Sequence, residues 1–195
     1  MPLSHAAARR LAHRRQIAIC GYERADGLFD IEAHLRDTKP FDMTLEDRGG
    51  RLAAGEALHE MTLRLTVDET MTIRGCEAEI RHGPFHACGD AGAHFDRLVG
   101  LAIRKGFLRE AAARVGGVDG CTHLRELLQQ IGTTAFQTLY PVRARRSAAA
   151  KAHGGEESGT ELINTCHAFA DTGAVVKRRW PKHWRAAEGG EAESG

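Results

Sequence analysis

Two segments in which apolar and polar side chains strictly alternate constrain the fold of this chain most strongly. Strand side chains point to opposite faces in turn, so each segment predicts a strand with one buried and one polar face. The first segment covers residues 29–36 and the second covers residues 59–67. Their apolar positions are Phe29, Ile31, Ala33 and Leu35 in the first, and Met61, Leu63, Leu65 and Val67 in the second.

Each alternating segment belongs to a predicted β-hairpin. Asp26-Gly27 is a strong turn signal within residues 16–37, and Asp68-Glu69 marks a turn within residues 58–80. Between the hairpins, residues 38–57 are polar and interrupted by proline and glycine, which is typical of a loop. The first half of the chain therefore predicts about four antiparallel strands.

Helical patterns follow the strands. We expect a helix capped by Asp90, a shorter helix within residues 105–117, and a longer one from Thr122 to about Leu139. Strands followed by helices indicate an α+β fold, in which about three helices cover one face of the antiparallel sheet. The apolar stripe of the first helix would be Phe95, Leu98, Val99 and Ala102, and that of the last Leu124, Leu127, Leu128, Ile131 and Ala135.

The length of 195 residues fits a single domain with a core over about residues 9–140. After Pro141 the sequence is small, charged and low in complexity, so we expect a linker over about residues 142–160. An ordered C-terminal arm is expected over about residues 161–184, and a frayed tail over residues 185–195.

Composition excludes several classes of partner. A net charge of +1 and an aromatic content of 6% argue against binding to nucleic acid. The sequence contains no run of about 18 apolar residues, so no membrane span is predicted.

Location and oligomeric state are further expectations. The basic first 15 residues are not followed by an apolar signal core, so we expect a cytoplasmic protein with five free thiols. Exposed edge strands and the C-terminal arm make a homodimer a further expectation.

Three pairs of cysteine and histidine are candidate metal ligands. Thiolate and imidazole together suit zinc or iron, although the spacing here is not that of a zinc finger. Cys121 stands out because unpaired N–H groups at a helix start stabilise a thiolate. Buried packing is the competing interpretation for every cysteine. The expected metal ligands are Cys121, His123, Cys88 and Cys166.

The polar face of the first alternating segment offers Asp30, Glu32 and His34 for acid–base chemistry. A solvated strand face is the commoner explanation of such a pattern. His59 is different, because it is in register with the apolar face of its strand, where an unpartnered imidazole is costly. We count these four residues as candidate catalytic groups.

Several motifs in order resemble the bacterial family named domain of unknown function 2889, over about residues 9–184. They are YERADGLFDIEAHLRDTKP, LHEMTLRLTVDETMTIRGCEA, RLVGLAIRKGF, GGVDGCTHLRELL with TTAFQT, and TCHAFADTGAVVKRRWP. In the family, glycine usually occupies the position of Ala33. The resemblance implies a small bacterial protein from a family whose genes often lie among those for the breakdown of aromatic compounds.

A weaker resemblance concerns architecture. The order of strands, a cysteine-bearing loop and a cysteine at a helix start is similar to the iron–sulfur cluster scaffold fold. That likeness implies convergence of Cys88 and Cys121 with Cys76 as a third ligand, joined by His59, His123 or Cys166.

These observations support three hypotheses. In the first, the chain is a metal-assisted lyase that binds zinc or iron and eliminates a small fragment, such as formaldehyde, from a lignin-derived aromatic metabolite; hydrolysis is a variant. In the second, it carries a metal or an iron–sulfur cluster without turnover. In the third, it is a metal-free enzyme or ligand-binding module in which the cysteines only pack.

Overall fold

The computed structural model describes residues 2–152 and 159–186. The chain divides into two compact units, Met1–Pro141 and Val142–Gly195, which we describe separately. Within the described ranges, no helix is both long and apolar enough to cross a bilayer.

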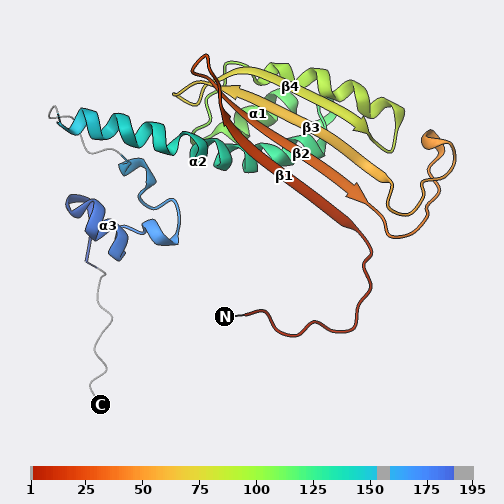
Figure 1. The fold of residues 1–195 in the computed structure, drawn as a ribbon, viewed down its shortest axis with the longest axis horizontal. Helices are drawn as coiled ribbons and strands as arrows, with labels where there is room; N and C mark the ends of the chain where they lie inside the picture. Colours follow the sequence, from red (N-terminus) through yellow and green to blue (C-terminus); the bar gives the residue numbers. More distant parts are fainter. Residues whose placement is uncertain (1, 153–158, 187–195) are drawn as a thin grey trace. The chain divides into compact units, whose positions relative to one another are not determined.

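The first unit contains one antiparallel sheet of four strands in the order β1-β2-β3-β4 (Figure 1). The strands are β1 (Arg14–Glu23), β2 (Phe29–Thr38), β3 (Ala57–Val67) and β4 (Ile73–His82). Gly27 turns the first hairpin with φ of 82°, a left-handed conformation that glycine adopts without steric cost. Both predicted hairpins are therefore confirmed, and β2 and β3 lie in the middle of the sheet.

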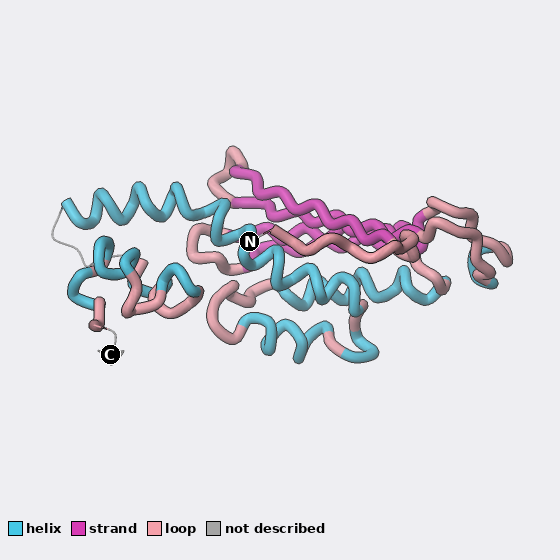
Figure 2. Tube along the Cα trace, turned by 90° about the horizontal axis from the view of Figure 1, so that it is seen from below, coloured by secondary structure: helices cyan, strands magenta, loops and turns pink. Residues whose placement is uncertain are grey.

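The core of this unit lies between one face of the sheet and α1 (Phe107–Val115), η2 (His86–Leu98) and the first turns of α2 (Thr122–Ala152), which lie on the same side of the sheet (Figure 2). We call this face of the sheet the inner face. α1 contributes three buried side chains, and α2 contributes six from its first five turns. The inward side chains of β2 and β3 are those that the alternation predicted. Buried residues of α2 are Leu124, Leu127, Leu128, Ile131, Ala135 and Leu139.

The predicted helix after Asp90 is instead a run of 3-10 turns, η2 (His86–Leu98). Its glycines disfavour an α-helix. They also let η2 lie close to β4, since a Cβ on Gly92 would be 3.1 Å from the carbonyl oxygen of Ala78. Phe95 and Leu98 are buried as expected, whereas Val99 is 43% exposed and leaves the predicted stripe.

α2 is longer than the sequence pattern suggested. It does not end near Leu139 but continues through Pro141 to Ala152, so the first part of the expected linker is helical. Residues 142–152 are rich in alanine, arginine and lysine, which have high helix propensity. That propensity outweighs the hydrogen bond lost at Pro141 inside the helix.

The second unit has its own small core. It consists of short helical turns and α3 (Ala174–Arg179), around the buried Val176 and Trp180. The Phe169 ring lies 5.8 Å from that of Trp180, and Trp184 Nε1 donates a 3.1 Å hydrogen bond to the Thr172 carbonyl. This unit contains the expected C-terminal arm. Part of the expected linker and most of the expected tail lie outside the described residues.

The close packing of Gly21 on β1 against α2 yields a test of this arrangement. A Cβ on Gly21 would lie 1.8 Å from Thr138 Oγ1, so Gly21→Ala must push the strand and helix apart. We expect it to lower the free energy of unfolding by about 1–3 kcal/mol in urea denaturation. Gly75→Ala on β4 is the matched control, because its Cβ would lie an ordinary 3.5 Å from Thr66. Equal effects of the two substitutions would contradict this packing.

Candidate functional site

The candidate site is built around Asp37, near the end of β2. Asp37 continues the inward alternation one step beyond Leu35, so its carboxylate points into the core and its side chain is only 1% exposed. In the sheet register Asp37 lies opposite Arg15 on β1 and His59 on β3. Two neighbouring strands therefore present polar side chains to the same buried carboxylate.

Arg15 holds Asp37 in a bidentate ion pair. Its Nε donates to Oδ1 at 2.9 Å and its Nη2 donates to Oδ2 at 2.8 Å. His59 Nδ1 lies 3.1 Å from Oδ2, and His13 Nε2, just before β1, lies 3.3 Å from Oδ1. A carboxylate removed from water needs such partners, because an unpaired buried charge is very costly.

The first turn of α2 closes the site. The His123 ring stacks on His59 with a centroid separation of 4.0 Å, and His123 Nε2 lies 3.9 Å from Asp37 Oδ2. One turn further along the helix, Glu126 accepts a 2.9 Å hydrogen bond from Arg15 Nη1. We call Arg15, Asp37, His59 and His123 the Asp37 cluster. Three strands and a helix start thus meet at one point.

Burial sets the protonation states of the Asp37 cluster. It lowers the pKa of His59, with the adjacent His123 adding to the effect, and these outweigh the attraction of Asp37. Burial and the charge of Arg15 likewise lower the pKa of His123. Burial opposes ionisation of Asp37, but the hydrogen bonds and charge of Arg15 outweigh it and lower the pKa of the carboxyl. The cluster thus favours an anionic carboxylate beside two neutral imidazoles.

These protonation states are those of metal ligands, which must offer free lone pairs. Asp37, His59 and His123 each present one ligand atom, and the three atoms lie within 4.8 Å of one another. Among the described residues, this is the group of three or more histidine, cysteine or carboxylate side chains whose ligand atoms lie that close together. Two carboxylates, Asp37 and Glu126, face one guanidinium here, which leaves one excess negative charge for a cation. The residues therefore fit zinc or non-haem iron, both of which accept two imidazoles and a carboxylate.

The cysteines occupy separate places. Cys121 Sγ is 4.0 Å from His123 Nδ1, the ring nitrogen other than the one that approaches Asp37. Cys88 lies against Gly83, where β4 leads into η2, and Cys166 is exposed in the second unit. Cys76 lies in the middle of β4, and burial raises the pKa of its thiol to about 12. Among the described residues the structure brings together no three thiols of the kind that an iron–sulfur scaffold uses.

Asp30, Glu32 and His34 lie on the opposite, outer face of the sheet. Thr66 Oγ1 donates to Asp30 at 2.7 Å, Arg64 Nη2 donates to Glu32 at 2.8 Å, and His34 Nε2 lies 3.3 Å from Glu60 Oε1. The structure therefore separates these three expected catalytic residues from the fourth, His59. It joins His59 with His123, which was expected as a metal ligand.

Sequence reasoning missed Asp37 and Arg15, although the signal for Asp37 was present. The alternation that predicted Leu35 as inward also makes Asp37 inward, two residues later on the same strand. A carboxylate at an apolar register position is as informative as the imidazole of His59, which the same reasoning did identify. Arg15 becomes identifiable only once the pairing of β1 with β2 is known.

The model of the family described as protein of unknown function (DUF2889) matches residues 13–137. The chain belongs to this family. The resemblance seen in the sequence is thereby confirmed over that range, which contains the whole Asp37 cluster and ends before the C-terminal motif at residues 165–181. No curated protein and no solved structure matches the chain.

The pKa shifts in this DUF2889 domain predict how its stability depends on pH. Folded His59 and His123 bind protons less readily than in the unfolded chain, so acid favours unfolding. Their contribution is complete above the unfolded pKa of about 6.5 and is lost as the pH falls below it. We therefore expect the free energy of unfolding, measured with a chelator present, to fall between about pH 7 and pH 5.

Replacing both imidazoles, in His59→Gln/His123→Gln, should flatten that slope. Asp68→Asn is the control, because hydrogen bonds from Thr70, Thr72 and Arg74 outweigh burial and lower the pKa of Asp68 to about 2. Its contribution is lost only as the pH falls from about 4 to 2, so the slope between pH 7 and 5 should persist. A slope unchanged by the double substitution would contradict this assignment.

Proposed function

We propose that this protein is a metal-assisted lyase that acts on a small aromatic metabolite. The observation that carries the proposal is the approach of Asp37, His59 and His123, whose ligand atoms lie within 4.8 Å of one another at the end of the core. Zinc or iron is the metal class that this ligand set favours. The aromatic substrate rests on the family resemblance, which implies a role in the breakdown of aromatic compounds.

The concrete reaction is the release of formaldehyde from a hydroxymethyl group beside an aromatic ring. A base removes the hydroxyl proton, the carbon–carbon bond breaks to give formaldehyde, and the electron pair left on the ring-bearing carbon takes up a proton. A bound metal would act as a Lewis acid on the substrate oxygen. The reaction needs no oxidant or reductant.

The proton transfer is assigned to His13. This imidazole is 37% exposed and lies 3.3 Å from Asp37 Oδ1, yet it is outside the three-ligand group. Asp37 can accept a hydrogen bond from this ring and orient it, as carboxylates do for catalytic histidines. Asp30, Glu32 and His34 are the groups expected from the sequence to move the proton. They face the other side of the sheet, so the proposal gives them no part in the reaction.

A metal-free acid–base enzyme is the second candidate. Arg15 already engages both oxygens of Asp37, and His59 Nδ1 lies at hydrogen-bond distance from Oδ2. This arrangement is that of an imidazole oriented by a carboxylate, with the second ring nitrogen left to act as a base. The carrier hypothesis has less support, because the thiols lie apart.

Metal analysis separates the two candidates. We expect protein purified without a histidine tag to contain about one zinc or iron per chain, as one mononuclear site requires. His123→Ala should lose the metal, because it removes one of the three ligand atoms. His34→Ala on the outer face should retain it. Folded protein that neither contains nor binds either metal would contradict metal assistance and favour the acid–base candidate.

Turnover tests the role of His13. With a hydroxymethyl aromatic substrate, His13→Gln should reduce kcat about 10²–10⁴-fold while the metal content stays unchanged, as expected for loss of a general base. Formaldehyde release is the measured product. The matched control is His34→Gln, which should keep wild-type kcat. Normal turnover by His13→Gln, with His34→Gln impaired, would reverse the assignment of the base.

A further inference from the structure

The two edges of the sheet differ in how well they are protected. β4 carries charged side chains along its length, has bulges at both ends of its pairing with β3, and lies against η2. Charges, bulges and covering elements are the usual means by which an edge strand avoids pairing with another chain. β4 is therefore protected against pairing with a strand of another chain.

β1, at the opposite edge, lacks these features. Its seven central residues, Gln16 to Tyr22, include no charge and no proline, and its pairing with β2 has no bulge. Most of its side chains are exposed, including the large ring of Tyr22, a residue that is 51% exposed. Figure 1 shows β1 running the full length of the sheet at its margin. A long edge with regular pairing and uncharged central residues is a template for strand addition.

The sequence of β1 is complementary to itself when reversed. A two-fold axis perpendicular to the sheet makes two copies of β1 antiparallel and keeps the inner faces of both sheets on one side. Paired residues then share a face, as strand pairing requires. With Ile19 on the axis, Arg15 lies opposite the partner's Glu23, and Ala18 opposite the partner's Cys20. Each pair consists of two inward or two outward positions.

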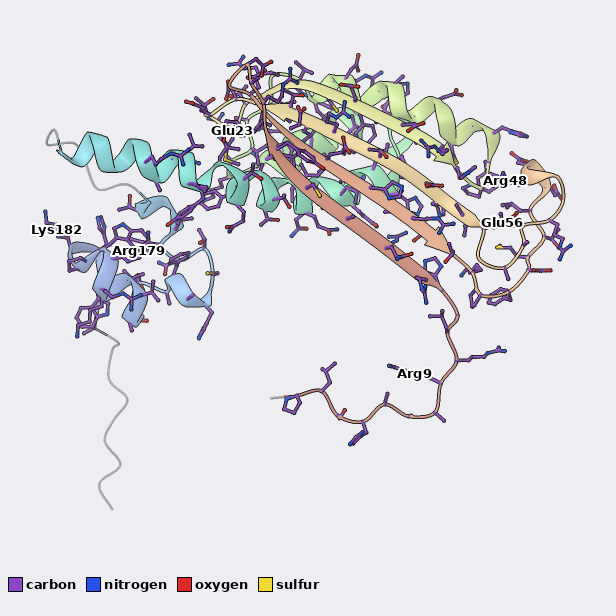
Figure 3. All side chains as sticks on the ribbon, in the orientation of Figure 1. Arg9, Glu23, Arg48, Glu56, Arg179 and Lys182 are labelled. Atoms are coloured by element: carbon purple, nitrogen blue, oxygen red, sulfur yellow. The ribbon has the colours of Figure 1, made fainter. Side chains whose placement is uncertain are left out.

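Charge also favours this register. Glu23 is exposed at the hairpin end of β1, where it is labelled in Figure 3. Arg15 is 34% exposed and uses three of its five N–H groups on Asp37 and Glu126, so two remain for a further carboxylate. The pairing thus places opposite charges at both ends of the shared edge and uncharged side chains between them.

We propose that the β1 edge binds a second copy of this chain, forming a continuous eight-stranded antiparallel sheet with Ile19 on the two-fold axis. The proposal is independent of the function of the Asp37 cluster. It commits to a second copy because this register pairs Arg15 with Glu23 and pairs inward positions with inward ones and outward positions with outward ones. A different protein strand at this edge is the competing outcome.

Disulfide trapping tests both the interface and its register. Ala18 and Cys20 are exposed on the outer face. In the proposed register Ala18→Cys places the new thiol opposite the partner's Cys20, and directly opposed residues have Cβ atoms about 4.5–5.5 Å apart. Mild oxidation should convert most of this variant to a covalent dimer. Ala18→Cys/Cys20→Ser should remain uncrosslinked, whereas a register centred on Ala18 would trap the double variant too.

Analytical ultracentrifugation provides the second measurement. The unmodified chain should sediment as a dimer, and Glu23→Lys should weaken dimerisation at least tenfold by placing a lysine opposite the partner's Arg15. Glu79→Lys makes the same charge change on β4 and should leave the dimer intact. A monomer at all concentrations, a dimer equally weakened by both substitutions, or crosslinking that persists without Cys20 would overturn the proposal.

Discussion

The buried carboxylate of Asp37 is the constraint on which the rest of the site depends. Its side chain is 1% exposed, so the charge is stable there only with partners that replace water. Each element around it contributes one partner: Arg15 from β1, His59 from β3 and His123 from α2. Without any one of these elements, the Asp37 carboxylate would lose a partner that offsets the cost of burying its charge. The site and the fold are therefore stabilised together.

Strand register has a direct consequence for this carboxylate. Because side chains alternate, a shift of β2 by one residue would move Asp37 to solvent and bring His34 inward. The buried row of Phe29, Ile31, Ala33 and Leu35 opposes such a shift, since it would expose four apolar side chains at once. The hydrophobic core thus fixes the position of the polar centre, although none of these residues carries its chemistry.

How well the sequence predicts a feature of this structure depends on whether neighbouring residues or residues far apart in the chain determine it. Period-two alternation is local, and it predicts both hairpins, the inward position of His59 and, when followed two residues further, that of Asp37. The helix start at Thr122 is also local, and it correctly places Cys121 just before a long helix and His123 in its first turn. Two local predictions were wrong. The expected helix after Asp90 is η2, because its glycines disfavour an α-helix despite the apolar spacing. The end of α2 lies beyond Pro141, because alanine and arginine have high helix propensity.

The grouping of the candidate residues could not be predicted, because it depends on contacts between elements far apart in the sequence. Arg15 and Glu126 are 111 residues apart and meet only when α2 lies against the sheet beside β1. Residue chemistry alone favoured the cysteines as ligands. Distances instead favour two imidazoles and a carboxylate, with the Cys121 thiol beside the far nitrogen of His123.

The composition of the Asp37 cluster argues against a purely structural role. Arg15 and Asp37 alone could hold β1 against β2, and replacing a buried ion pair with packed apolar side chains is often neutral or stabilising. Stability therefore gives little reason to keep a carboxylate at an inward strand position. It gives less reason to stack two imidazoles over that carboxylate and hold them neutral, since burial opposes their protonation. Neutral imidazoles beside an anionic oxygen are useful when their lone pairs bind a metal or accept a proton. These features favour the reactive centre that we propose at this end of the sheet, held in place by the core.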